Sequence, residues 1–97
     1  DVIVFADDLE GEELRILMNL VLDHGKRLCA VFGGDEEHGF RYVIGSRILD
    51  MRPLAKELNE TFHGRGGGKS EMVQGSVQGN ESEMRAWIQE KARKMNG

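Results

Sequence analysis

Residues 62–76 read FHGRGGGKSEMVQGS, and this stretch decides how the second half of the chain folds. Its three consecutive glycines suit neither a helix nor a strand, because each costs roughly 0.5–1 kcal/mol there relative to alanine. An amphipathic segment runs directly into the glycines, and the apolar pair Met72-Val73 follows them within four residues. The pattern therefore predicts an ordered loop between a helix and a strand. A flexible glycine linker is the alternative.

Two cations flank the glycines, and neutral hydrogen-bonding groups follow them. Adjacent amides in a Gly-rich turn can form a concave nest for an anion, and nearby cations strengthen it. This chemistry favours a phosphate, either of a nucleotide or of a nucleic-acid backbone. The candidate nucleic-acid-binding residues are Arg65, Gly66, Gly67, Gly68, Lys69, Gln74, Gly75 and Ser76.

Helices are expected on both sides of this stretch. Asp50 can cap a helix that has Pro53 in its first turn and reaches Phe62. After a strand over residues 72–78, Asn80 and Glu83 resemble a capping box. The helix that follows has one apolar face, which predicts core positions for Met84, Trp87, Ile88, Ala92 and Met95.

The first half of the chain alternates between strand and helix patterns. Residues 2–6 are a continuous apolar run, predicted as a strand covered on both faces, and residues 12–24 have helical spacing with Gly25 as a stop. Strands over 28–32 and 40–45 flank turn residues 33–39, which indicates a parallel crossover followed by a hairpin. The predicted fold class is α/β, a β-α-β-β-α-β-α sandwich with a mixed sheet and helices packed on its faces.

Composition narrows the class of protein. A chain of 97 residues is one domain, residues 1–97, and it has no apolar run near the roughly 20 residues of a membrane span. Its single cysteine, Cys29, lies in an apolar run and is predicted to be a buried, inert thiol, which fits a cytoplasmic protein. The chain opens on Asp1 instead of methionine, which suggests a fragment of a larger protein.

The net charge of −4 argues against a general nucleic-acid binder. The charge is uneven, however. Residues 1–60 hold seven Lys/Arg against thirteen Asp/Glu, a balance of −6, whereas residues 61–97 hold six against four, a balance of +2. Any contact with RNA is therefore expected to be local, with few phosphates neutralised.

We expect no active site, cofactor or metal in this chain. Its three histidines form no metal-binding pair, and no nucleophile stands beside a base. His63 adjoins the glycines but has no partner base or nucleophile nearby in sequence. The pair Asp7-Asp8 offers oxygen ligands for magnesium, yet a polar exit from the first strand is the favoured interpretation.

The spacing of Leu58-Asn59, Phe62, the segment GRGGGK over 64–69 and MVQGS over 72–76 resembles the DHH-associated (type 1) domain. This domain occurs at the C-terminus of alanyl-tRNA synthetases and of alanyl-tRNA editing proteins, and it also follows the catalytic domain of DHH phosphoesterases. The resemblance covers nearly the whole chain. It implies a C-terminal accessory domain in protein biosynthesis that binds tRNA or a short nucleic acid through the glycine motif.

The resemblance also bears on the parent protein. The phosphoesterase branch has a histidine after the three glycines, where this chain has Lys69, so the alanyl-tRNA branch and its editing proteins are favoured. The implied partner is an N-terminal catalytic domain, with zinc expected in that domain if the parent is an editing protein. Two alternatives stay open: the substrate-binding domain of a phosphoesterase, and a module that docks its partner domain or forms a homodimer.

Overall fold

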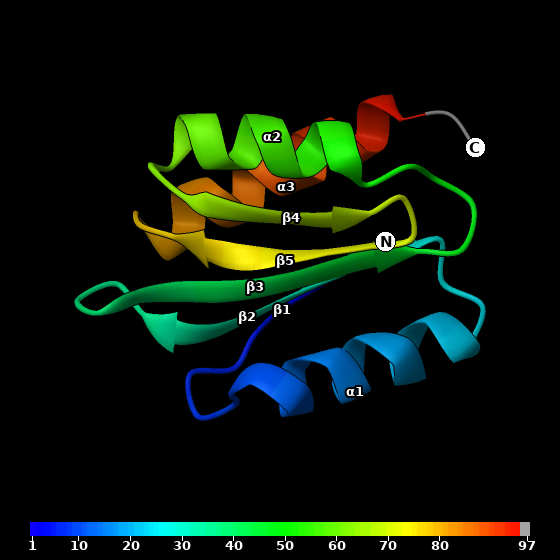
Figure 1. Ribbon diagram of the computed structural model, residues 1–97, viewed down its shortest axis with the longest axis horizontal. Helices are drawn as coiled ribbons and strands as arrows, with labels where there is room; N and C mark the ends of the chain where they lie inside the picture. Colours follow the sequence, from blue (N-terminus) through cyan, green and yellow to red (C-terminus); the bar gives the residue numbers. More distant parts are fainter. Residues whose placement is uncertain (96–97) are drawn as a thin grey trace.

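The computed structural model describes residues 1–95 and contains five strands and three helices (Figure 1). In chain order these are β1 Val2–Phe5, α1 Gly11–Asp23, β2 Leu28–Asp35, β3 Gly39–Ser46, α2 Arg52–Thr61, β4 Arg65–Lys69, β5 Met72–Val77 and α3 Glu81–Lys94.

The strands form one mixed sheet in the order β1-β2-β3-β5-β4. β1 pairs with β2 in parallel, and every other neighbouring pair is antiparallel. The predicted crossover through α1 and the predicted hairpin of β2 and β3 are both confirmed. Figure 1 shows α1 on one side of the sheet and α2 and α3 on the other, so the predicted α/β sandwich is also confirmed.

Each face of the sheet has its own core, because successive side chains of a strand point to opposite faces. On the α1 face, the buried helix residues Leu14, Met18 and Leu22 pack on buried residues of β2 and β3. On the other face, α2 and α3 contribute a larger set of buried residues: Leu54, Ala55, Leu58, Met84, Ile88 and Ala92. Cys29 is fully buried, as predicted.

The glycine run is a strand and not the predicted loop. β4 covers Arg65–Lys69 and pairs antiparallel with β5 through the two-residue turn at Ser70 and Glu71. Glycine is unfavourable in a strand on average, but β5 offers an unpaired edge here, and the backbone bonds of that edge outweigh the conformational cost. The prediction failed because it treated glycine propensity without this tertiary partner.

Smaller differences have local causes. β1 is an edge strand whose four residues are only partly buried. Val2 and Val4 pack against the α1 core and Ile3 and Phe5 against the opposite core, so the predicted covering of both faces is present but incomplete. Trp87 is also only partly buried: its ring packs edge-on against Phe62, with Lys91 over it, while Ile88 takes the central core position.

The helix before the glycines begins one residue later than predicted, with Asp50 accepting a 3.0 Å hydrogen bond from the Arg52 amide.

Helix α3 begins at the predicted N-cap, with one of the two hydrogen bonds of the predicted capping box. Asn80 is its N-cap, and the Asn80 side chain accepts a 3.0 Å bond from the Glu83 amide. A second acceptor comes from far away in the sequence, because the carboxylate of Glu36 in the β2–β3 turn accepts a 3.0 Å bond from the Glu81 amide. The hairpin tip therefore helps to fix the start of the last helix.

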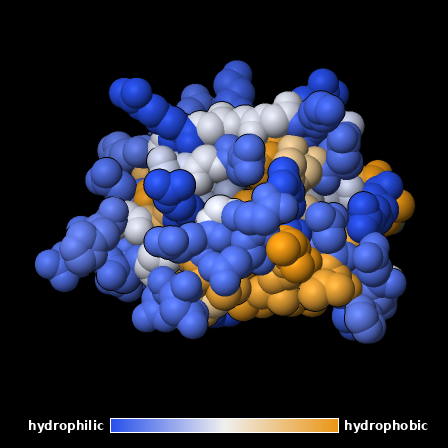
Figure 2. Space-filling model, turned by 60° about the horizontal axis from the view of Figure 1, so that its bottom comes forward, coloured by the Kyte–Doolittle hydropathy of each residue, from blue (hydrophilic) through white to orange (hydrophobic). Residues whose placement is uncertain are grey.

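The outer side of α1 is not entirely polar. Ile16 and Leu20 are 52% and 53% exposed, and Figure 2, which turns the α1 side of the molecule forward, shows an apolar area bordered by hydrophilic residues. Among residues 1–95, no helix is both long and apolar enough to cross a membrane.

Candidate nucleic-acid interface

The α1 face of the sheet is covered over β2 and β3, where α1 packs, and the strand pair β5–β4 extends beyond it. Met72 packs into the α1 core, whereas Val73 and Val77 belong to the opposite core. Strand alternation therefore turns Gln74 and Ser76 to the α1 side. The residues of β4 that are in register with Met72, Gln74 and Ser76 face the same way. Five of the eight predicted site residues therefore share one exposed surface: Arg65, Gly67, Lys69, Gln74 and Ser76.

The other three predicted site residues, Gly66, Gly68 and Gly75, face the α2 side. A Cβ atom at Gly66 would lie 2.5 Å from the Gly75 Cα and 2.9 Å from the Tyr42 hydroxyl oxygen, and a Cβ at Gly75 would lie 2.9 Å from the same hydroxyl. Gly66 also has φ +151°, which side chains other than hydrogen resist. The prediction of an anion nest assumed a turn, so the strand conformation of β4 removes its basis; Gly66 and Gly75 instead make room for Tyr42.

Two linked hydrogen bonds stabilise this arrangement. Tyr42 is in register with Gly75, which is in register with Gly66. The Tyr42 hydroxyl donates a 3.0 Å hydrogen bond to Asn59 Oδ1, and Asn59 Nδ2 donates a 3.2 Å bond to the Gly66 carbonyl. Burial raises the pKa of the Tyr42 phenol, and the bond to Asn59 offsets part of that rise. Helix α2, β3 and β4 are thus joined below the exposed surface.

Gly67 and Gly64 play opposite roles. A Cβ at Gly67 would meet nothing within 4 Å, so the backbone at the centre of β4 is open on the α1 side. A Cβ at Gly64 would lie 2.3 Å from the Ser76 carbonyl oxygen and 2.5 Å from a Val77 methyl carbon. Gly64 therefore allows the chain leaving α2 to pass close to β5, while Gly67 leaves the surface free for a ligand.

The two cations of β4 are available for a ligand. Arg65 and Lys69 are exposed, and neither forms an ion pair with any residue in the range 1–95. Both side chains lie on the α1 side with Gly67 between them in sequence. The surface has two positive charges beside an uncovered stretch of backbone.

The sequence-based site omitted Arg41. This residue is in β3, in register with Ser76 and therefore one strand away from it. It is exposed although its neighbours Phe40 and Tyr42 are buried. A lone cation inside an apolar strand was the signal that could have identified it, because alternation places such a residue on the face opposite to its buried neighbours.

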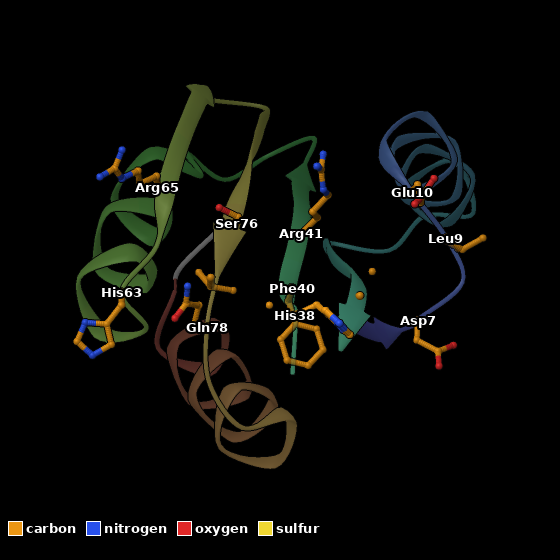
Figure 3. A pocket seen from close by; sticks show the side chains of 14 residues that line it. Asp7, Leu9, Glu10, His38, Phe40, Arg41, His63, Arg65, Ser76 and Gln78 are labelled. Atoms are coloured by element: carbon orange, nitrogen blue, oxygen red, sulfur yellow. The ribbon is translucent and has the colours of Figure 1, made fainter. Parts of the chain in front are cut away.

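A groove of about 440 Å³ runs along this part of the sheet. Figure 3 shows Ser76 between Arg65 and Arg41, with Glu10 and Asp7 on the side of the loop that leads into α1. His63 also lines the groove, with the left-handed φ of +52° that ends α2. Within the described chain, Asp7 and Asp8 are not part of a cluster of three or more metal-ligating side chains.

Comparison with known proteins places this fold in a family. The DHHA1 domain model matches residues 1–95. An alanine–tRNA ligase from Acholeplasma laidlawii (strain PG-8A) is 31% identical over 75 residues, which are 77% of this chain and 9% of the ligase. The chain therefore spans about a tenth of the length of that relative.

A solved structure has the same fold. The C-Ala domain of the alanyl-tRNA synthetase from Aquifex aeolicus superposes with a TM-score of 0.76 at 20% identity, covering 92% of this chain and 87% of that domain. The resemblance inferred from the glycine motif is confirmed by these matches, and the chain belongs to the DHHA1 domain family.

Proposed function

We propose that this chain is a tRNA-binding accessory domain from the C-terminal part of an alanyl-tRNA synthetase or an alanyl-tRNA editing protein. The observation that carries the proposal is the uncovered surface of β4 and β5, where Arg65 and Lys69 have no acidic partner among residues 1–95. The similarity to an alanine–tRNA ligase supports the choice of tRNA as the nucleic acid. The chain itself catalyses no reaction in this proposal, and the catalytic domain of the parent is its covalent partner.

Binding on this surface depends on local contacts, because a net charge of −4 gives no general attraction to RNA. Arg65 and Lys69 bind phosphates, and Gln74 and Ser76 donate hydrogen bonds from the adjacent strand. The open backbone at Gly67 lets an RNA strand approach β4 closely. Gly66 and Gly75 contribute indirectly, by leaving space for the Tyr42 side chain, and Gly68 by letting β4 lie close to the backbone of Met72 and Val73.

The experiment is a titration of the chain with tRNA specific for alanine at several salt concentrations. Lys69→Ala should weaken binding and reduce the slope of log K against log salt by about one unit, because one phosphate contact is lost. Lys94→Ala is the matched control: this exposed lysine on α3 pairs with Glu90 over 3.5 Å and lies outside the proposed surface. An undetectable affinity of the parent chain for tRNA, or a larger effect of the control than of Lys69→Ala, would contradict the proposal.

Self-association is a second candidate function, favoured by the exposure of Ile16 and Leu20 on α1. Two copies that pack through α1 would bury both side chains and remove apolar surface from water. Sedimentation of the chain over a range of concentrations tests this. A concentration-dependent dimer that Leu20→Lys dissociates would support it, and a monomer at every concentration would exclude it.

A further inference from the structure

Three side chains from three neighbouring strands form a row across the groove. Arg41 of β3 is in register with Ser76 of β5, and Ser76 is in register with Arg65 of β4. All three are exposed on the α1 side and line the groove. Two strand spacings separate the arginine Cα atoms, about 10 Å, a span that two long side chains can close around one phosphate with the serine hydroxyl between them.

The ion pairs of the molecule single out the same two arginines. The chain has eight arginines. Six of them have a carboxylate partner within residues 1–95, and these are Arg15, Arg27, Arg47, Arg52, Arg85 and Arg93. The two without one, Arg41 and Arg65, stand on either side of Ser76. A guanidinium group that forms no ion pair with a carboxylate can donate two parallel hydrogen bonds to one phosphate.

Carboxylates are nevertheless near. Asp7 and Glu10 line the wall of the groove formed by the loop before α1, opposite the row, and neither pairs with Arg41 or Arg65 in the described residues. A groove with cations on one wall and acids on the other disfavours a string of phosphates. It fits a ligand that carries one phosphate at one end and hydrogen-bond donors at the other.

We propose that the row Arg41–Ser76–Arg65 binds the phosphate of a single unpaired nucleotide, whose base amino group donates to the acidic wall at Asp7 and Glu10. Carboxylates accept from the N4 amino group of cytosine and repel the O4 carbonyl of uracil, so the groove prefers cytidine to uridine. This inference rests on the proposed binding of RNA but adds a phosphate contact at Arg41, outside the glycine run, and a base preference that the glycine run does not provide.

The direct test is titration of the chain with CMP, UMP, cytidine and inorganic phosphate, followed through backbone amide signals by NMR. CMP should shift the amides around Arg41, Ser76 and Asp7, and it should bind several-fold more tightly than UMP, cytidine or phosphate alone. Arg41→Gln should weaken CMP binding about tenfold, the usual loss for one charge-assisted hydrogen bond. Arg47→Gln, an exposed arginine just beyond the same strand, is the matched control and should stay within twofold.

Removing an acid gives a signature that a general electrostatic surface cannot produce. Asp7→Ala should weaken the binding of CMP but leave or strengthen the binding of inorganic phosphate, because the variant loses an acceptor and a repulsive charge together. A variant that binds both CMP and phosphate more tightly would show that the surface responds to charge alone and would overturn the inference.

Repeating the Arg41→Gln measurement with tRNA separates this inference from the proposed function. Loss of affinity for both CMP and tRNA would support both and identify the nucleotide as part of an RNA. Parent-level binding of CMP by Arg41→Gln, with tRNA binding by the parent intact, would overturn the inference alone. Arg41-dependent CMP binding by a chain that binds no tRNA would retain the nucleotide site and overturn the proposed function.

Discussion

The Tyr42 hydroxyl donates a 3.0 Å hydrogen bond to Asn59 Oδ1, across a pair of glycines that leave space for the tyrosine side chain. Those glycines, Gly75 and Gly66, are in register with each other and with Tyr42. The two faces of the glycine run therefore have different structural roles. One face fits against an aromatic side chain and α2, and the other leaves the backbone open beside two cations.

The same substitution should destabilise the fold at one glycine and have almost no effect at its neighbour. Gly66→Ala should lower the free energy of unfolding by about 2–4 kcal/mol, because the new methyl group meets the Gly75 backbone and Tyr42 and because the φ of Gly66 is unfavourable for alanine. Gly67→Ala should stay within about 0.5 kcal/mol of the parent, since its Cβ enters open space. Urea denaturation of both variants tests this, and equal destabilisation would contradict it.

Removing the Tyr42 hydroxyl tests the two hydrogen bonds that link Tyr42, Asn59 and Gly66. Tyr42→Phe keeps the ring but leaves Asn59 Oδ1 without its donor, so the variant should lose about 1–2 kcal/mol of stability. Hydrogen exchange should also quicken at the Gly64 amide, which donates to the Asn59 carbonyl over 2.8 Å. An unchanged stability would mean that water replaces the hydroxyl at no cost.

The end of α2 stores a small amount of strain. His63 follows the C-cap Phe62 and has a left-handed φ of +52°, a conformation that glycine adopts readily. His63→Gly should therefore raise the free energy of unfolding by about 0.5–1 kcal/mol. Lower stability in this variant would show that the imidazole makes a stabilising contact that outweighs the backbone term.

Stability should fall at alkaline pH for a specific reason. Burial raises the pKa of the Cys29 thiol from 9.0 to about 11. Because the folded chain holds this proton more tightly than the unfolded chain, the contribution is fully present below pH 9 and is lost as the pH rises toward 11. Unfolding free energies measured from pH 8 to pH 11 should decline above pH 9 in the parent. In Cys29→Ala the decline should begin only near pH 10, where Tyr42, whose pKa is also raised by burial, becomes the main group.

Most of the fold was predictable from local patterns. The apolar spacing of α1, the stop at Gly25 and the cap at Asn80 each reflect chemistry within a few residues, and the structure agrees with all three. β4 was missed because its own residues, three of them glycine, have low strand propensity, and the prediction did not consider their pairing with β5. Trp87 was placed in the core from helical spacing, yet the geometry of α3 gives that position to Ile88 and leaves the indole at the border.

The candidate site was predictable in part. Arg65, Lys69, Gln74 and Ser76 lie together because they are close in sequence on a hairpin. Gly66 and Gly75 looked like ligand-binding residues because a sequence does not reveal that Tyr42, more than twenty residues earlier, fills the space beside them. Arg41 was missed for the same reason, since only the pairing of β3 with β5 brings it to Ser76.

The most direct test of the central claim compares how tightly the variants Gly67→Glu and Gly67→Gln bind the tRNA that is specific for alanine. Both side chains enter open space on the α1 side of β4, so both variants should retain the stability of the parent. If the β4–β5 surface binds RNA, the carboxylate placed between Arg65 and Lys69 should weaken binding at least about tenfold more than the neutral amide of the same size. Equal affinities of the two variants and the parent would show that RNA does not contact this surface.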